Sequence, residues 1–244
     1  MASAVTKILI PAGALGIPYD REALARGLEH ELDLIAIDGG STDSGPYYLG
    51  TGRSKYSRAA TKADWANLMA ARSTAGVPLL IGTAGTSGAD SAVDWMLDIT
   101  LEIAKERGEK LKIATLKSGQ EKQMIIQAYT EGAITPLEGA PDLDIQILEH
   151  TTNIVALAGI EQIQAALASG ADIIIAGRAT DTAIIAALPI ARGCHKGAAW
   201  HGAKIAECGA LATTNPNTGV ILMRFDEAGF TITPLGEDTS ATPY

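Results

Sequence analysis

The sequence contains only two cysteines, Cys194 and Cys208, among 244 residues. Two thiols are too few for a disulfide framework, and no C-x-x-C pair with further ligands indicates a zinc site. Long apolar runs are also scarce: none reaches the roughly 18 residues of a spanning helix, and Pro189 interrupts the run 184–191. The amino terminus lacks a basic region followed by a long apolar core, as a signal peptide requires. We expect a soluble, cytoplasmic protein with reduced thiols.

Positive charge is also in deficit, with 19 Lys and Arg against 28 Asp and Glu, which gives a net charge of -9. An acidic surface repels nucleic acids and anionic membranes, so neither is an expected partner. The chain is 47% hydrophobic and long enough to bury a sizeable core. These values favour one large α/β domain.

The chain is organised around residues 171–182, which combine a buried strand, a break and a charged cluster. The β-branched run 172–176 is too short for a helix and predicts a strand that is buried on both faces. Gly177 ends the strand, and Arg178, Thr180 and Asp181 precede the next helical pattern. Polar side chains therefore collect at the carboxyl end of a strand, where open α/β sheets bind ligands.

Strand and helix patterns alternate along the chain and predict a three-layer α/β fold, with a mainly parallel sheet and helices on both faces. An open sheet and a (β/α)-barrel both fit this alternation. The expected strands are 7–10, 32–37, 77–81, 111–116 and 172–176, with a further short strand at 144–148. Residues 1–193 form the expected α/β domain, and 194–244 form a smaller helix-plus-hairpin extension.

The loop that follows the second strand is rich in glycine, acids and hydroxyl groups. Glycines allow close backbone approach, hydroxyls and amides hold a carboxylate or phosphate, and an acid at a strand end can act as a base. The alternative is an Asx-rich turn that only caps backbone amides. The candidates are Asp38 and Asp43 for acid-base work and Gly39, Gly40, Ser41 and Thr42 for binding. The segment 45–58 is too long for a turn and is expected to be a functional loop or lid.

The loop after the third strand opens a long helix, whose free amides would form an anion site. It matches neither a Walker A loop nor G-x-G-x-x-G, and the alternative function is helix capping by Ser87 or Asp90. The candidates here are Thr83, Gly85, Thr86 and Ser87. At the end of the fifth predicted strand, Arg178 can hold an anion bidentately, with Thr180 and Asp181 beside it. The alternative is a structural Arg178–Asp181 pair with Asp181 as the helix N-cap.

Histidines and a cysteine supply the remaining candidates. His150 and Asn153 lie in an irregular polar segment where a ligand contact is expected. On the predicted helix 198–208, His201, Lys204 and Cys208 can share a face while Glu207 points elsewhere. Neither H-E-x-x-H nor G-x-S-x-G occurs, so we expect no metal and no serine nucleophile.

Three motifs together resemble one known family. They are Gly-Arg-Ala-Thr-Asp-Thr-Ala from Gly177, H-x-x-K-I-A-E-C-G-A from His201 and Phe-Thr-Ile-Thr-Pro from Phe230. The combination resembles the amino-terminal domain of the acyclic terpene utilisation family, the AtuA type, most clearly over residues 172–243. The loop that begins at Ile37 resembles a segment in one branch of that family. The positions carried over are Arg178, Asp181, His201, Glu207 and Cys208.

The resemblance implies catabolism of branched or terpenoid acids as acyl-CoA derivatives. Family members are usually longer and a small companion domain or subunit often follows, so the expectation is either a fragment of a longer protein or a divergent short form. No dinucleotide fingerprint is visible, so we expect a hydratase, lyase or hydrolase that acts on a carboxylate or acyl-CoA, with no redox cofactor and with CoA only as part of the substrate. Its expected partners are further copies of itself or a small companion subunit. The alternative is a non-catalytic ligand-binding or assembly subunit.

Overall fold

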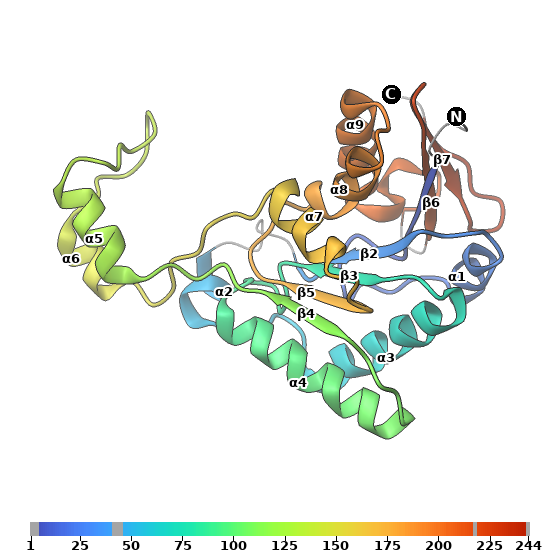
Figure 1. The fold of residues 1–244 in the computed structure, drawn as a ribbon, viewed down its shortest axis with the longest axis horizontal. Helices are drawn as coiled ribbons and strands as arrows, with labels where there is room; N and C mark the ends of the chain where they lie inside the picture. Colours follow the sequence, from blue (N-terminus) through green and yellow to red (C-terminus); the bar gives the residue numbers. More distant parts are fainter. Residues whose placement is uncertain (1–4, 41–45, 217–218, 243–244) are drawn as a thin grey trace.

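The computed structural model describes residues 5–40, 46–216 and 219–242. Its centre is a seven-stranded open sheet with the order β4-β5-β3-β2-β1-β6-β7 (Figure 1). Strands β1 to β5 are mutually parallel, whereas β6 and β7 run antiparallel to their neighbours. The strands are β1 Thr6–Ile10, β2 Leu34–Asp38, β3 Leu79–Gly82, β4 Ile113–Leu116, β5 Ile173–Ala176, β6 Ile221–Phe225 and β7 Phe230–Pro234. The expected three-layer α/β class is confirmed, and the sheet is not a barrel.

Helices cover both faces of the sheet (Figure 1). On one face pack α1 Arg21–Leu28, α3 Arg58–Ala75 and α4 Asp90–Arg107. On the other face pack α7 Ile160–Ala168, α8 Ala183–Ala191 and α9 Lys196–Ala206. Side chains of a strand alternate between the two faces, so Ile35 and Ile37 enter the first core while Leu34 and Ala36 enter the second. The same alternation directs Asp38, at the end of β2, toward the face covered by α8.

Local sequence determines where the long helices begin and end. The Ser57 hydroxyl caps α3 by accepting a hydrogen bond from the Ala60 amide. Gly76 and Gly108 end α3 and α4 in the left-handed conformation, with φ of 67° and 65°. Glycine adopts this conformation without the steric penalty that a Cβ brings.

The connections that follow the adjacent strands β3 and β5 lie on opposite faces of the sheet. The chain moves from β1 through β2 and β3 to the edge strand β4 by way of the α1, α3 and α4 face. It returns to β5 and then to β6 by way of the α7, α8 and α9 face. The neighbours β3 and β5 therefore lead to helices on different faces, which is the point where open α/β sheets bind their ligands.

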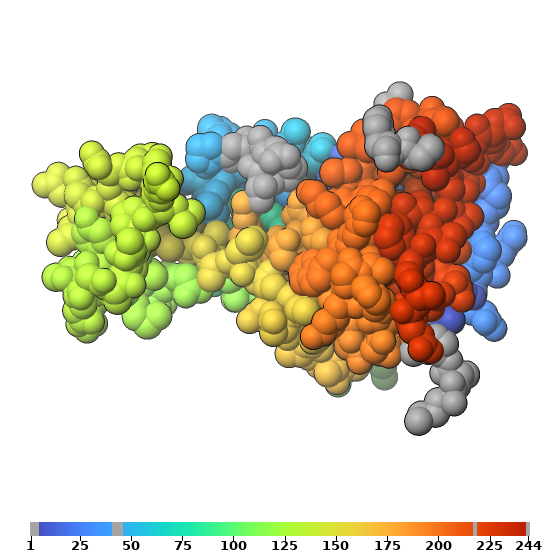
Figure 2. Space-filling model, turned by 90° about the horizontal axis from the view of Figure 1, so that it is seen from above, coloured from blue at the N-terminus to red at the C-terminus, as the bar shows by residue number. Residues whose placement is uncertain are grey.

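A small lobe projects from the body beyond β4 (Figures 1 and 2). It contains α5 Lys122–Thr130 and α6 Ile145–His150, and Leu148 is the one buried residue of these two helices. The expected strand at 144–148 is wrong, because Asp144 caps a helix there by accepting from the Ile147 amide. The remaining short elements are α2 Pro46–Thr51 and the 3-10 helix η2 Gly209–Ala212. Within the described ranges, no helix combines the length and apolarity needed to cross a membrane.

The last part of the chain continues the main sheet. Strand β6 pairs with β1 along its whole length, from Thr6 opposite Phe225 to Ile10 opposite Ile221. The hairpin of β6 and β7 therefore shares the core of the α/β body, and Phe225 is fully buried in it.

Candidate functional site: a carboxyl cluster at the sheet edge

The polar turns that follow β2, β3 and β5 meet at one edge of the sheet. The Gly39 amide donates to the Gly82 carbonyl at 2.7 Å, and the Thr86 amide donates to the Gly39 carbonyl at 3.1 Å. The Arg178 amide donates to the Gly88 carbonyl at 2.9 Å. Parallel strands place their carboxyl ends on one edge, and here direct hydrogen bonds join the three turns.

The turn 83–89 is part of the core rather than an open cradle. Every one of its residues is buried. The Thr83 amide donates to the Gly177 carbonyl at 3.0 Å, and the Thr83 hydroxyl donates to the Ala179 carbonyl at 3.1 Å. Gly88 has a φ of 66°, and a Cβ there would lie 2.4 Å from the Arg178 nitrogen. The amides of Thr83 and Thr86 are thus occupied within the protein, and an anion would have to displace these bonds.

Asp38 is the most deeply buried carboxyl of this edge, with 5% of its surface exposed. The Gly40 amide donates to its Oδ2 at 3.3 Å, whereas no described group hydrogen-bonds its Oδ1. Burial, followed by the charge of Asp181, raises the pKa of Asp38 well above its ordinary value. The backbone hydrogen bonds of the two following glycines act in the opposite direction and are outweighed. The surroundings of Asp38 therefore favour the protonated form of this carboxyl over the ionised form.

Asp181 interacts through its charge with Asp38 and with a third carboxyl, Glu207. Burial and then the charge of Glu207 raise the pKa of Asp181, while the charges of Arg178 and Lys204 lower it. Among the described residues no ion pair within 4.0 Å joins Arg178 to Asp181. The residue that caps α8 is Thr182, so the reading of Asp181 as N-cap is wrong. Arg178 instead acts on Asp181 through its charge.

Glu207 is held from two sides at the end of α9. The Thr182 hydroxyl donates to its Oε2 at 2.5 Å, and the Lys204 ammonium pairs with its Oε1. The side chain of Glu207 is 6% exposed and that of Lys204 is 71% exposed. The expectation that Glu207 points away from Lys204 is wrong, because the two are an i,i+3 pair on one face of the helix. Thr182 belongs to the motif that begins at Gly177, but the sequence does not reveal its bond to Glu207, because the two residues come from different helices.

Two glycines bring the end of α9 against the turn after β1. A Cβ on Gly13 would lie 3.0 Å from the Cys208 carbonyl carbon, and one on Gly209 would lie 2.7 Å from the Gly13 nitrogen. Beside this contact lies a cavity of about 400 Å³ with a mainly apolar lining. Its lining residues are Ala12, Gly13, Ile17, Pro18, Cys208, Ala210, Leu211, Pro216 and Gly219. An apolar cavity thus adjoins the turn that carries Glu207.

Several candidate residues lie away from this cluster. His150 is exposed on the projecting lobe, where its Nδ1 lies 2.7 Å from the Gln146 carbonyl. Asn153 donates to the Leu49 carbonyl at 2.6 Å and so ties the lobe connection to α2. His201 packs edge-on against Phe230, with 5.5 Å between ring centroids.

The other candidates have structural partners or lie outside the described residues. The Thr180 amide donates to the Ala158 carbonyl, and Gly85 has a φ of 63° in the buried turn. The Ser87 hydroxyl accepts from the Ala89 amide, and the Asp90 carboxylate accepts from the amides of Ser118 and Gly119. Neither caps α4, whose N-cap is Ala89 without a side-chain bond, so that alternative is wrong. The candidates Ser41, Thr42 and Asp43 lie outside the described residues.

In the portion of the chain that the structure describes, no three His, Cys, Asp or Glu side chains form a group suited to hold a metal ion. The carboxyls of Asp38, Asp181 and Glu207 are instead linked by charge and by a hydroxyl and an ammonium group. Burial and mutual repulsion raise the pKa values of Asp38 and Asp181, and perturbed carboxyls of this kind are common in acid-base sites.

The cluster lies largely in a region that matches a known family. Residues 75–240 match the model of the acyclic terpene utilisation family protein AtuA. The chain belongs to the AtuA family. The match covers more than half of the chain and includes Asp181, Lys204 and Glu207, whereas Asp38 precedes it. Comparisons with curated proteins and with solved structures found no match. The resemblance inferred from the motifs is therefore confirmed at the level of the family.

Proposed function

We propose that this AtuA-family chain is a catabolic enzyme of the hydratase, lyase or hydrolase type, acting on a carboxylate or acyl-CoA of branched or terpenoid acid breakdown. The observation that carries the proposal is the state of Asp38, which is buried, has an unpartnered oxygen and has a raised pKa. Buried carboxyls with perturbed pKa values are typical of acid-base sites. The family name supports the metabolic setting.

In the proposed mechanism Asp38 supplies a proton and Asp181 exchanges one. A carboxylic acid whose pKa is raised by burial can protonate a carbonyl oxygen or a leaving group. Asp181 is half-buried. Burial raises its pKa, but the charges of Arg178 and Lys204 lower it and so oppose the shift. Glu207 is held in place by the Thr182 hydroxyl and the Lys204 ammonium group. In this proposal protons pass between the buried Asp38 and the half-buried Asp181.

The apolar cavity beside Cys208 supports a substrate with a hydrocarbon part. Its volume of about 400 Å³ lies within the range of small-molecule sites. Ile17, Pro18 and Leu211 offer the apolar contact that a branched acyl chain gains by leaving water. The polar head of such a substrate would then lie toward the carboxyl cluster.

The test is turnover of branched acyl-CoA thioesters in saturated, α,β-unsaturated and 3-hydroxy forms. Mass spectrometry of the products separates addition or loss of water from carbon-carbon cleavage and from release of free CoA. Asp38→Asn should lower the rate at least about a hundredfold, since positioned acid-base groups contribute 10²–10⁴-fold. The exposed Asp98→Asn is the matched control and should keep the rate. Equal rates for the two variants would remove Asp38 from the mechanism.

A non-catalytic assembly role is the second candidate, and the projecting lobe favours it. The lobe stands apart from the body of the molecule (Figure 2). The lobe and its connections expose large apolar side chains. These are Met124 at 60%, Leu137 at 85%, Ile145 at 39%, Ile147 at 49% and Leu157 at 61%. Exposed apolar groups of this kind often mark protein-protein contacts, so a companion subunit or a second copy would cover them. Light scattering of the intact chain and of a Leu137→Ser variant tests this role by the loss of an oligomer.

A further inference from the structure

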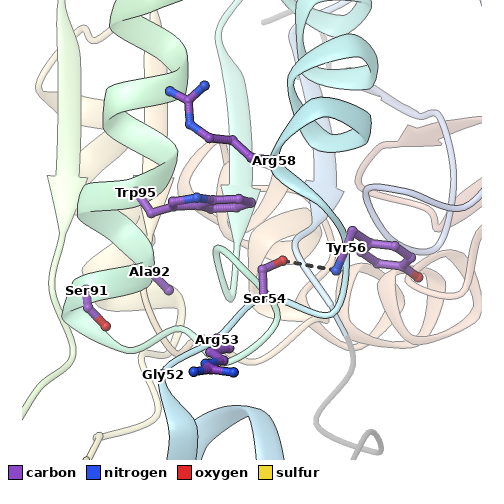
Figure 3. A pocket seen from close by; sticks show the side chains of 8 residues that line it. All are labelled: Gly52, Arg53, Ser54, Tyr56, Arg58, Ser91, Ala92 and Trp95. Atoms are coloured by element: carbon purple, nitrogen blue, oxygen red, sulfur yellow. Dashed lines mark hydrogen bonds between the residues drawn. The ribbon is translucent and has the colours of Figure 1, made fainter.

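A second cavity lies at the start of α4, on the opposite face of the sheet from the carboxyl cluster. It has a volume of about 400 Å³ and is lined by Gly52, Arg53, Ser54, Tyr56, Arg58, Ser91, Ala92 and Trp95 (Figure 3). The sequence had indicated a functional loop at 45–58, and this loop supplies one wall of the cavity.

The wall is fixed to the body at several points. Gly52 has a φ of 64°, and a Cβ there would lie 3.3 Å from the Ser91 hydroxyl oxygen. The Lys55 amide donates to the Thr86 hydroxyl at 3.1 Å, which attaches the segment to the buried turn after β3. The ring of Tyr56 lies against Gly16, where a Cβ would be 2.8 Å from it. The cavity is therefore preformed, which lowers the entropy cost of binding.

The charge of this cavity contrasts with that of the whole chain. Two arginines line it and no acid does, although the chain carries a net charge of -9. Arg58 is paired with Glu102 at 2.6 Å, but Glu102 also binds Lys62 at 2.7 Å and so would keep a partner if Arg58 turned to a ligand. Within the described ranges no carboxylate pairs with Arg53. Guanidinium groups in this setting suit phosphate oxygens.

An aromatic side chain, Trp95, lines the cavity together with these two arginines. Figure 3 shows the indole of Trp95 extending from α4 toward the segment of Ser54, with Arg53 and Arg58 on different sides of the ring in this view. Trp95 packs partly against the core, so its ring is held in place. A fixed indole offers a flat base a stacking partner, and stacking contributes about 1–3 kcal/mol per base. The hydroxyls of Ser54 and Ser91 add hydrogen-bonding groups at the rim of the cavity.

We propose that this cavity binds a nucleotide, with the base stacked on Trp95 and the phosphates on Arg53 and Arg58. The ligand is either a free nucleotide or the nucleotide end of a CoA thioester. The second source rests on the proposed function, because it makes this cavity the anchor of the substrate. Nucleotide binding itself does not require Asp38 to be catalytic.

Isothermal titration of the full chain tests the proposal with ADP, adenosine 3′,5′-bisphosphate, adenosine and inorganic phosphate. Both nucleotides should bind, while adenosine and phosphate alone should bind at least about tenfold more weakly. Arg53→Ala should weaken nucleotide binding about tenfold or more, since a charge-assisted hydrogen bond contributes about 1.5–3 kcal/mol and 1.4 kcal/mol is tenfold. Trp95→Leu should weaken the nucleotides but leave phosphate unchanged. Glu102→Gln should strengthen binding, because it frees Arg58.

Arg21→Ala, which removes an exposed arginine at the start of α1, is the matched control and should bind nucleotides as the parent does. Tighter binding of the 3′,5′-bisphosphate than of ADP assigns the cavity to CoA, and the reverse order assigns it to a free nucleotide. No binding of either nucleotide, or binding that Arg53→Ala and Trp95→Leu leave intact, overturns the proposal. Asp38→Asn should retain nucleotide binding whether or not it retains turnover, so the two proposals fail separately.

Discussion

The charge of Asp181, before α8, raises the pKa of Asp38, at the end of β2. The two residues belong to different strand-helix units and meet because β2 and β5 both end at the same edge of the sheet. Burial acts on both carboxyls in the same direction as this repulsion. The protein thus keeps two acids in surroundings that disfavour their ionised forms.

Asp38 should make the protein less stable as the pH rises. Below the unfolded pKa of about 3.8 the carboxyl is protonated in both states and has no effect. Above it the unfolded state loses the proton while the folded state retains it, so the free energy of unfolding falls by up to about 1.4 kcal/mol per pH unit. Asp38→Asn removes this effect, and its stability relative to the parent should rise between about pH 4.5 and 7. Urea unfolding at both values measures the difference.

Asp98→Asn serves as the control for that measurement because the side chain is exposed. Its stability relative to the parent should not change with pH. A pH-independent difference for Asp38→Asn as well would mean that the Asp38 carboxyl ionises normally in the folded state.

Replacement of Glu207 should lower the pKa of Asp181. The charge of Glu207 is the second cause of the raised value, after burial. Glu207→Gln removes the charge and keeps an oxygen that accepts from Thr182, so NMR titration should show a lower Asp181 pKa with little loss of stability. Glu207→Ala also leaves the Thr182 hydroxyl without its acceptor and should cost about 2 kcal/mol. An unchanged Asp181 titration in both variants would contradict the coupling.

Gly88 should tolerate alanine much less well than Gly108, although both have φ near 65°. A Cβ at Gly88 would lie 2.4 Å from the Arg178 nitrogen, whereas nothing lies within 4 Å of a Cβ at Gly108. Gly108→Ala should cost only the conformational strain, about 1–2 kcal/mol. Gly88→Ala adds a backbone clash that costs roughly a further 1–3 kcal/mol. Denaturant unfolding compares the stability of the two variants. Equal losses in the free energy of unfolding would show that the turns after β3 and β5 separate easily.

The amides of α5 and α6 should exchange hydrogen faster than those of β3 and β5. Both strands are fully buried, while Leu148 is the one buried residue in the two helices. Regions with few buried apolar contacts open locally at a low free energy. Hydrogen exchange followed by mass spectrometry measures these exchange rates for each peptide. Strong protection of α5 and α6 in the intact chain would instead indicate that another molecule covers the lobe.

Much of the fold follows from local patterns. The runs 7–10 and 172–176 predicted strands where β1 and β5 lie, and the polar turns after Ile37, Ile81 and Ala176 predicted a shared edge. The strand prediction for 144–148 was wrong because a short apolar run fits either a strand or a helix. The Asp144 carboxylate caps the segment and so favours the helix. His150 was placed with the site because the residues around it are polar, but polarity there reflects the exposure of the lobe.

The sequence by itself determined the α/β class, the family and the edge where polar turns collect, because parallel strands with helical crossovers put all their carboxyl ends on one side. Only the tertiary structure decided which of those polar groups meet. Thr182 reaches Glu207, Asp181 acts on Asp38, and Arg53 shares a cavity with Trp95. Each pairing depends on how helices from distant segments pack across the sheet. Local periodicity tells whether a side chain faces the core or solvent, but not which partner it finds there.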